Sequence, residues 1–158
     1  MKLVVDASVV IRWFVPVQDS QEALNILAMD RKLVAPMIAK FEIAGALVRW
    51  AQTSEIGKSN SSKNLQQWLE AISSNVLRLE DDPIDLSVGA ELAVRIDHSV
   101  AECIYLAMAN RLGVPLVTAN DTFAIKAKKV CRPVFSITQI NSMAAEDHAE
   151  RKPKKAHG

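Results

Sequence analysis

The stretch Leu3-Val4-Val5-Asp6-Ala7-Ser8 decides the fold, because an uninterrupted apolar run ends there in a single carboxylate. A strand that is covered on both faces reads as a continuous Val/Leu run, so residues 2–5 predict a central parallel strand. Open α/β sheets bind their ligands at the carboxyl ends of such strands. Asp6 is therefore expected at the functional edge of a sheet, and a metal site is our first hypothesis.

Strand-like and helix-like segments alternate along the rest of the chain. Short apolar strands are expected at residues 32–35, 76–79, 115–119 and 133–137. Helices are expected between them, at residues 21–27, 37–52, 65–72, 83–93, 99–112 and 122–126. This alternation predicts an α/β fold, a three-layer αβα sandwich with a central, mainly parallel sheet. We expect Gly57 and the polar residues 59–62 to separate two helices.

Composition places the chain among single-domain globular proteins. It has 158 residues, of which 49% are apolar, enough for one core. The formal net charge of +1 gives no strong overall attraction to nucleic acid, so RNA binding would need local basic patches. We expect a domain over residues 1–140 and a polar, basic and disordered tail over residues 141–158.

Cysteine and hydropathy patterns exclude other classes of protein. Cys103 and Cys131 form no CxxC or Cys/His spacing, so we expect buried thiols rather than a disulfide framework or a zinc site. The sequence has no signal-peptide pattern and no apolar stretch of membrane-spanning length. We therefore expect a cytoplasmic protein with no membrane partner.

Polar residues recur where later elements begin. Together with Asp6, the candidate site residues are Glu42, Glu102, Asn120 and Asp121. Glu42 lies in an apolar helical context where an unpaired carboxylate is costly, and Arg49, two turns on, is only a partial partner. The strands that end at Asp6 and Asn120 are expected to be neighbours, so these side chains are expected to converge. Clustered carboxylates repel one another, and a bound divalent cation is the usual resolution.

Helix capping is the alternative interpretation for most of these positions. Asp6 could cap a helix that begins near Ala7. The segment Ser99-Val100-Ala101-Glu102 is an S-x-x-E capping box, in which the glutamate reaches back to the serine amide. Asn120 or Asp121 could cap the last helix. Taken one at a time these are ordinary caps, so both interpretations remain open.

Side chains beside the candidates receive weaker roles. Ser8 and Thr118 could hydrogen-bond a ligating carboxylate, although hydroxyls at strand ends more often satisfy their own backbone. His98 adjoins the candidates, and a lone histidine beside a capping serine is more often a surface residue than a general base. Asp97 is a less favoured substitute ligand.

Four motifs make the chain similar to a known family. They are Val4-Val5-Asp6-Ala7-Ser8, Pro36-x5-Glu42 followed by Ile43-Ala44-x-Ala46-Leu47, Glu102-Cys103-Ile104-Tyr105-Leu106-Ala107-Met108-Ala109, and Gly113-Val114-Pro115-Leu116-Val117-Thr118-Ala119-Asn120. With these motifs the chain resembles the PIN-domain ribonucleases, and more narrowly the VapC-type toxins of bacterial toxin–antitoxin pairs. The resemblance extends from residue 2 to about residue 140.

The resemblance implies an endoribonuclease dependent on Mg²⁺ or Mn²⁺, in which acidic side chains hold one or two ions that activate water against an RNA phosphodiester. Asp6 and Glu42 match the family's first two acidic positions, and with Glu102 they are the expected metal ligands. Glu102 and Asn120 each stand where the family usually has Asp. Glu102 therefore has a longer arm, while Asn120 keeps an oxygen ligand and loses a charge, for which Asp121 could compensate.

The resemblance also implies partners, namely an RNA substrate, a cognate antitoxin protein and a second copy in a homodimer. Trp13, Phe14, Val15 and Trp50 either offer apolar surface to such a partner or complete the core. Basic side chains that could contact RNA phosphates are Arg12, Lys40, Arg49, Lys126, Lys128, Lys129 and Arg132.

Two other functions remain as alternatives. The first is a catalytically weakened PIN-fold module that binds RNA or an antitoxin-like partner. This alternative remains open because Glu102 and Asn120 depart from the residues usual in the family. The second is a phosphohydrolase that uses Asp6 as its nucleophile. It ranks last because Ser8 stands where such an enzyme would need a second aspartate.

Overall fold

The computed structural model describes residues 1–130 and 133–150, the last five of these by their backbone alone. A five-stranded sheet in the order β3-β2-β1-β4-β5 lies at the centre, and all neighbouring strands are parallel. Along the chain the strands are β1 Lys2–Val5, β2 Lys32–Pro36, β3 Arg78–Glu80, β4 Leu116–Thr118 and β5 Val134–Ser136. The expected α/β class with a parallel central sheet is confirmed.

β1 occupies the middle of the sheet because its side chains are apolar on both faces. Leu3, Val4 and Val5 are fully buried, and Val4 pairs with Val34 of β2 on one side and Leu116 of β4 on the other. From β1 the chain builds the sheet in one direction through β2 and β3, and later in the other through β4 and β5. The boundary between β1 and β4 is therefore the topological switch point, where open α/β sheets bind ligands.

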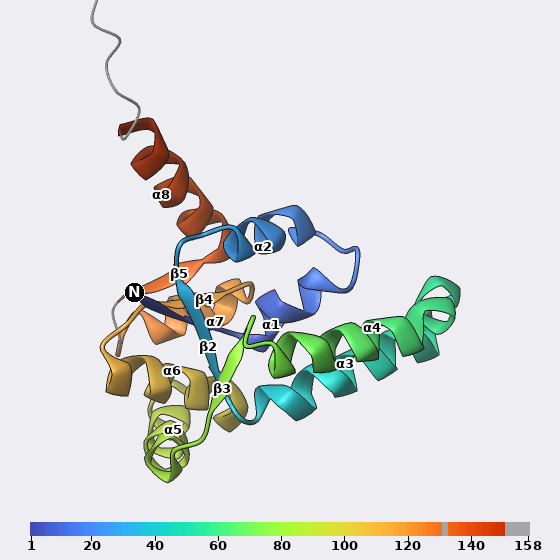
Figure 1. Ribbon diagram of the computed structural model, residues 1–158. Coiled ribbons are helices and arrows are strands. Elements are labelled where there is room, and N and C mark those ends of the chain that lie inside the picture. The colour runs from blue at the N-terminus through green and yellow to red at the C-terminus, as the bar shows by residue number, and fades with distance from the viewer. Residues whose placement is uncertain (131–132, 151–158) are drawn as a thin grey trace, which may run out of the picture.

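One face of the sheet is covered by α6 (Val100–Leu112), which packs on β1, β2 and β4. α5 (Pro83–Ile96) lies against the outer side of α6, and α7 (Asp121–Ala127) lies beside β4 and β5 (Figure 1). Because α5 covers its outer side, α6 is buried at consecutive positions through its middle rather than along a single stripe. The helix that carries Glu102 and Tyr105 is thus held from both sides.

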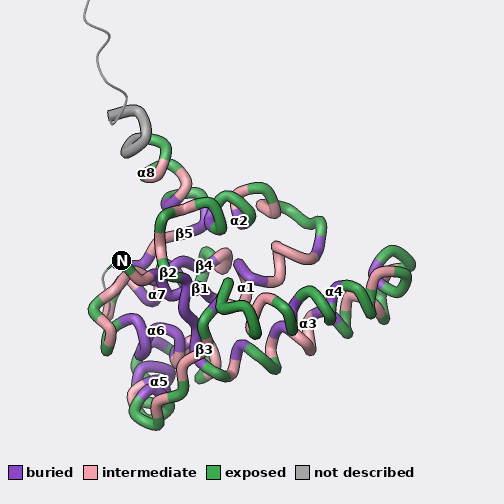
Figure 2. The backbone as a smooth tube through the Cα atoms, viewed as in Figure 1, coloured by how far each residue is buried: buried purple, intermediate pink, exposed green. Residues whose placement is uncertain are grey.

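Helices on the opposite face complete the three layers (Figure 1). They are α1 (Ala7–Val10), the 3₁₀ turn η1 (Ile11–Trp13), α2 (Ser20–Leu27) and α8 (Ile137–Glu150). From the carboxyl edge of the sheet, α3 (Ala39–Thr53) and α4 (Glu55–Ser73) extend as a long hairpin away from the body. Figure 2 shows that buried residues concentrate along the strands and the inner sides of the helices, while the far end of the hairpin is mostly exposed.

The break between α3 and α4 comes earlier than expected. The chain turns at Ser54, which is extended (φ −142°, ψ 130°) and accepts a hydrogen bond from the Gly57 amide on its hydroxyl oxygen at 3.2 Å. Gly57 and residues 59–62 lie inside α4, so the prediction that they separate two helices was wrong. Glycine is needed here because a Cβ atom would lie 2.5 Å from the Trp50 carbonyl oxygen. Side chains of residues 59–61 donate to carbonyls in the preceding turn, which accommodates them within the helix.

The C-terminal boundary also differs from the expectation. α8 runs to Glu150, so residues 141–150 are helical where a disordered tail was expected. Ile137 and Ile140 are 3% and 5% exposed. The side-chain nitrogen of Asn141, Nδ2, donates to the Glu22 carbonyl oxygen at 3.1 Å, which attaches the helix to α2. The basic residues 151–158 lie outside the described residues.

Cys103 is a fully buried thiol on α6, as expected, and burial raises its pKa to about 11. Cys131 lies outside the described residues. Within the part of the chain that the structure describes, no helix combines the length and the hydropathy needed to cross a membrane.

Candidate metal centre

The carboxyl ends of β1 and β4 bring Asp6 and Thr118 together at the switch point. Val5 pairs with Val117 in the sheet, and the next amide, that of Asp6, donates to the Val117 carbonyl oxygen at 3.0 Å. Asp6 is 2% exposed and Thr118 is fully buried. The sheet therefore fixes the backbone of Asp6 at the place that the sequence predicts.

Two hydroxyl groups hold one oxygen of the Asp6 carboxylate. Ser8 Oγ and Thr118 Oγ1 donate to Oδ2 at 2.5 Å and 2.8 Å. Each hydroxyl accepts in turn from a backbone amide at 3.0 Å, Ser8 from Ala119 and Thr118 from Asn120. The side chain of Asp6 makes no capping bond to α1. The carboxylate is thus oriented toward the sheet edge rather than used as a helix cap.

Glu42 reaches the same edge from the first turn of α3. Tyr105, fully buried on α6, donates from its hydroxyl to Glu42 Oε1 at 2.7 Å. Burial and the charges of Glu42 and Asp6 raise the pKa of Tyr105 well above its ordinary value, so the phenol remains a donor. Arg49 does not appear among the ion pairs of the described residues, which leaves Tyr105 as the partner of Glu42.

Glu102 completes the carboxylate cluster from the first turn of α6. Ser99 Oγ accepts from the Glu102 amide at 3.3 Å, which is the first half of the expected capping box. The second half is absent from the described bonds, because the Glu102 carboxylate accepts from the Ser99 hydroxyl at 3.0 Å, not from the backbone. His98 Nε2 and Asn120 Nδ2 also lie within hydrogen-bond distance of the carboxylate, at 2.5 Å and 2.8 Å.

Asn120 lies beside Glu102 and uses both ends of its amide. Its Oδ1 accepts from the Phe123 amide at 3.1 Å and so caps α7, while its Nδ2 faces Glu102. The oxygen expected as a metal ligand therefore accepts the capping bond, and the group that Asn120 points at Glu102 is a donor. Asp121, the first residue of α7, is exposed and makes no described hydrogen bond or ion pair with the other candidates, so the structure does not bring it into the cluster.

The three carboxylates influence one another electrostatically. Burial raises the pKa of Asp6, the Ser8 and Thr118 hydroxyls oppose the rise, and the charge of Glu102 adds to it. Burial also raises the pKa of Glu42, Tyr105 opposes the rise, and the charges of Asp6 and Glu102 add to it. Mutual repulsion of this kind is relieved by a cation placed among the groups.

The donor set fits a hard divalent cation, since carboxylate oxygens are the ligands that Mg²⁺ and Mn²⁺ prefer. Asp6, Glu42 and Glu102 would hold the ion, with Asp6 oriented by hydroxyls and Glu42 by a phenol. Across the described residues, no three His, Cys, Asp or Glu side chains already have an arrangement that could hold a metal ion. Binding would therefore have to draw these carboxylates closer together.

The sequence matches the PIN domain family over residues 3–129. The chain belongs to the PIN domain family. Ribonuclease VapC3 of Pyrobaculum aerophilum is 26% identical over 133 residues, which cover 84% of this PIN domain protein and 100% of that protein. The match confirms the resemblance that the four motifs indicate.

Two solved structures share this PIN fold. PAE2754 from Pyrobaculum aerophilum has a TM-score of 0.67 at 18% identity, over 92% of this chain and 96% of that chain. A chain in a toxin–antitoxin complex from Klebsiella pneumoniae has a TM-score of 0.62 at 17% identity, over 86% of this chain and 98% of that chain. At these identities the structures support the fold alone.

Sequence reasoning assigned no role to two residues of the PIN site. His98, expected at the surface, has a side chain that is 12% exposed and stacks on Phe123, with ring centroids 4.9 Å apart and planes inclined by 14°. The i,i+4 spacing between His98 and Glu102 is the sequence feature that could have predicted their contact. Tyr105 is the only tyrosine of the chain and lies about one turn after Glu102. Its long-range bond to Glu42 has no local signal.

Several basic residues proposed for RNA have structural partners. Arg12 donates to the carbonyl oxygens of Ser8 in α1 and of Gln18 in the segment that leads to α2. Lys126 donates to the Asp97 carbonyl oxygen. Lys128 donates to the Gln139 side chain at 3.0 Å. Arg132 lies outside the described residues. The structural contacts of these basic side chains are a sufficient reason for their presence, without RNA binding.

The aromatic residues considered for a partner pack against the core. Trp13 donates from its indole to the Ala23 carbonyl oxygen at 2.9 Å, and Phe14 meets Trp68 edge to face with centroids 6.2 Å apart. Trp50 is partly buried and packs on the same core. The interpretation that these aromatics complete the core is the one that their contacts favour.

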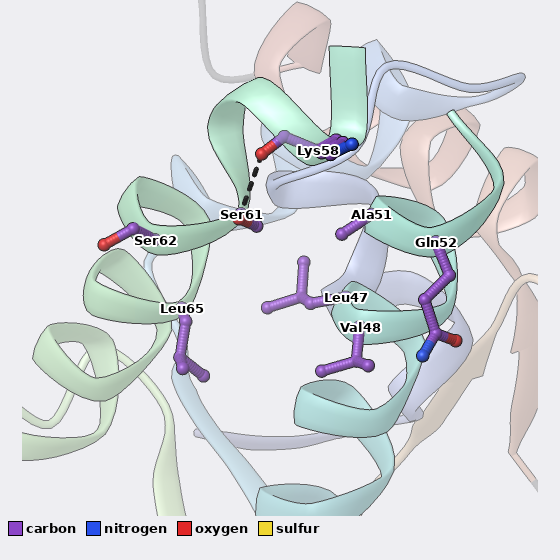
Figure 3. A pocket seen from close by; sticks show the side chains of 8 residues that line it. All are labelled: Leu47, Val48, Ala51, Gln52, Lys58, Ser61, Ser62 and Leu65. Atoms are coloured by element: carbon purple, nitrogen blue, oxygen red, sulfur yellow. Dashed lines mark hydrogen bonds between the residues drawn. The ribbon is translucent and has the colours of Figure 1, made fainter. Parts of the chain in front are cut away.

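A pocket of about 530 Å³ lies between α3 and α4, and the candidate site residues do not line it. Figure 3 shows Leu47, Val48 and Leu65 pointing into it from the two helices. Its full lining is Leu47, Val48, Ala51, Gln52, Lys58, Ser61, Ser62 and Leu65. The hairpin thus combines a polar site at its base with an apolar pocket farther along.

Proposed function

We propose that this PIN domain, residues 1–140 with the site Asp6, Glu42 and Glu102, is an endoribonuclease dependent on Mg²⁺ or Mn²⁺ that acts in the cytoplasm as the toxin of a toxin–antitoxin pair. The observation that carries the proposal is that Asp6 ends β1 at the switch point while Glu42 and Glu102 approach it from α3 and α6, near enough for the charges of neighbouring carboxylates to add to the raised pKa of Asp6 and of Glu42. The name of the relative VapC3, a ribonuclease, supports RNA as the substrate class.

The residues of this chain would prepare the site before substrate arrives. The hydroxyls of Ser8 and Thr118 leave Asp6 one defined orientation, and Tyr105 does the same for Glu42. A bound divalent ion would supply Lewis-acid activation of water and stabilise charge on the scissile phosphate. No nucleophilic side chain is required, so the task of these residues is to orient the oxygen donors that an ion would draw together.

The test is cleavage of a mixed RNA substrate by purified protein with Mg²⁺, with Mn²⁺ and with EDTA. We expect cleavage with a divalent ion, and its loss in Asp6→Asn, which keeps the size of the side chain and removes the charge. Asp30→Asn is the matched control, because Asp30 is exposed and lies in the turn before β2. A folded wild-type protein that stays inactive with both ions would favour the alternative of a PIN module that only binds RNA or an antitoxin-like partner.

The cognate antitoxin and the homodimer are the finer parts of the proposal. The toxin–antitoxin assembly of the Klebsiella pneumoniae neighbour supports a protein partner. The hairpin offers apolar surface for one, since Val48 and Leu69 are each 50% exposed and Leu65 is 38% exposed. Sedimentation velocity of the purified chain, alone and after coexpression with a candidate antitoxin, distinguishes a monomer, a homodimer and a heteromeric complex.

A further inference from the structure

The carboxylate of Glu102 is held differently from those of Asp6 and Glu42. His98 Nε2 at 2.5 Å and Ser99 Oγ at 3.0 Å contact its Oε2, and Asn120 Nδ2 donates to its Oε1 at 2.8 Å. The side chain of Glu102 is 22% exposed, so these contacts, rather than close packing, restrict it. A glutamate has one more rotatable bond than an aspartate, and these contacts fix that additional freedom.

The orientation of the Asn120 amide follows from its capping bond. Oδ1 accepts from the Phe123 amide, which is one of the free N–H groups at the start of α7. Because the amide group is planar, this bond sets the position of Nδ2 as well, and Nδ2 then points at Glu102. The N-cap residue of α7 therefore aims a donor at the first turn of α6.

His98 is also held by a residue of α7, together with the end of α5. Asp97 has φ 51° and ends α5, and the His98 amide then bonds to the Ala93 carbonyl oxygen at 3.0 Å. The imidazole stacks on the ring of Phe123, a fully buried residue of α7, with centroids 4.9 Å apart. Phe123 thus sets the place of two contacts to Glu102, through its amide for Asn120 and through its ring for His98.

We propose that Asn120 and His98 are positioning residues that orient the Glu102 carboxylate toward the metal site, so that a bound ion has only a short displacement to bring about. In this role Asn120 does not replace a lost ligand but supplies a hydrogen bond that an aspartate could not donate. The inference rests on the proposed function only in requiring that the site binds a divalent ion. Residues that orient a metal ligand commonly change metal affinity by about 10–100-fold when they are replaced.

The test replaces Asn120 with serine and measures Mn²⁺ binding by isothermal titration calorimetry. Serine is as good an N-cap as asparagine, so α7 keeps its cap while Glu102 loses the amide donor. We expect the dissociation constant for Mn²⁺ to rise about 10–100-fold and the Tm of the metal-free protein to change little. Asn110→Ser is the matched control, because Asn110 is exposed near the far end of α6, and it should leave both quantities unchanged.

The same substitution in a Glu102→Gln background separates a positioning residue from a ligand. If Asn120 acts through Glu102, Asn120→Ser weakens Mn²⁺ binding in the wild-type background and has little further effect once the carboxylate is gone. An equal weakening in both backgrounds would mean that Asn120 binds the ion itself, and this would overturn the proposal. An unchanged dissociation constant in the Asn120→Ser protein would overturn it as well.

His98→Phe is the second variant, since a phenyl ring retains the stack on Phe123 and removes the nitrogen that contacts Glu102. We expect a similar weakening of Mn²⁺ binding, again absent in the Glu102→Gln background. Loss of affinity in these variants with no RNA cleavage by the wild type would support the positioning role and refute the nuclease. Cleavage by the wild type with unaltered affinity in both variants would refute the positioning role alone, and a wild type that binds no Mn²⁺ would refute both.

Discussion

Gly89 controls how closely α5 approaches the helix that carries Glu102 and Tyr105. A Cβ atom at this position would lie 3.0 Å from the Ile104 amide nitrogen and 3.1 Å from the Cys103 carbonyl carbon. Both are backbone atoms of α6, so no side-chain rotation can relieve the contact. Gly89→Ala must therefore move the two helices apart by a few tenths of an ångström or strain one of them.

The expected magnitude is the difference between two effects of the added methyl group. Alanine in a helix interior is favoured over glycine by about 1 kcal/mol. Overpacking against atoms that cannot give way costs about 1–3 kcal/mol, and here the atoms are backbone, so the upper part of that range applies. Gly89→Ala should lower the free energy of unfolding by about 1–2 kcal/mol. In a chain of this length that corresponds to a fall in Tm of ~2–8 °C.

Gly45→Ala is the matched control for the same substitution. Gly45 lies within α3, and an added Cβ atom would meet only Arg49 Nη1, at 3.5 Å, which is an ordinary contact with a flexible side chain. The helix propensity gain then remains, and Tm should rise by ~2–4 °C. Thermal unfolding followed by circular dichroism, with urea unfolding as a check, measures both variants. A rise in Tm for Gly89→Ala equal to that for Gly45→Ala would refute the close packing of α5 on α6.

Three further predictions concern the buried polar contacts. Tyr105→Phe removes a bond that opposes the raised pKa of Glu42, so that pKa should rise further and the acidic limb of the pH–rate profile for RNA cleavage should move to higher pH. The raised pKa of Asp6 means that its charge destabilises the fold above the unfolded value of 3.8, so Asp6→Asn should raise the Tm of the metal-free protein at pH 7. That gain should disappear below about pH 3, where both states are protonated. Arg111→Met leaves Asp85, which is 3% exposed, without its bidentate partner and should cost about 3 kcal/mol in urea unfolding.

Each of these predictions has an outcome that contradicts it. An unshifted acidic limb in Tyr105→Phe would mean that Glu42 does not control cleavage in its ionised form. A constant Tm difference between Asp6→Asn and wild type from pH 3 to pH 7 would show that the effect is packing, not charge. A loss below about 1 kcal/mol in Arg111→Met would mean that water reaches Asp85 when the arginine is removed.

The strands, and the pairing of β1 with β4, could be predicted from sequence because buried parallel strands carry their own signal. Successive side chains of a strand point to opposite faces, and Leu3, Val4 and Val5 of β1 are all fully buried, so both faces of this strand require apolar residues. The end of the first long helix could not be predicted in the same way. Serines and asparagine at residues 59–62 favour turns by local propensity, but in α4 the hydroxyls and amide of residues 59–61 bond to carbonyls of their own helix. Packing of α4 on α3 decides between the two outcomes.

The three carboxylates of the candidate site could be predicted from different signals. Asp6 closes an apolar strand, Glu42 lies in an apolar helical context, and Glu102 begins one of the four family motifs. The hydroxyl partners of Asp6, Ser8 and Thr118, are among the expected contacts. The partners of the two glutamates could not be found, since Tyr105 meets Glu42 across 63 positions of sequence and His98 depends on a ring 25 positions later. The direction of the Asn120 amide is likewise invisible in sequence. Its oxygen faces the Phe123 amide and its nitrogen faces the Glu102 carboxylate, and these two contacts set the orientation.

Capping and site formation, which compete as interpretations of the sequence, occur together in the structure. Ser99 caps α6 and also donates to the Glu102 carboxylate, and Asn120 caps α7 while it donates to the same group. This is possible because the N-terminal turns of α6 and α7 meet at the carboxyl edge of the sheet, where the caps lie beside the carboxylates. A residue that caps a helix can therefore also contact the site carboxylates. Substitutions that keep the cap and change only the second bond, such as Asn120→Ser, are the ones that can separate stability from metal binding.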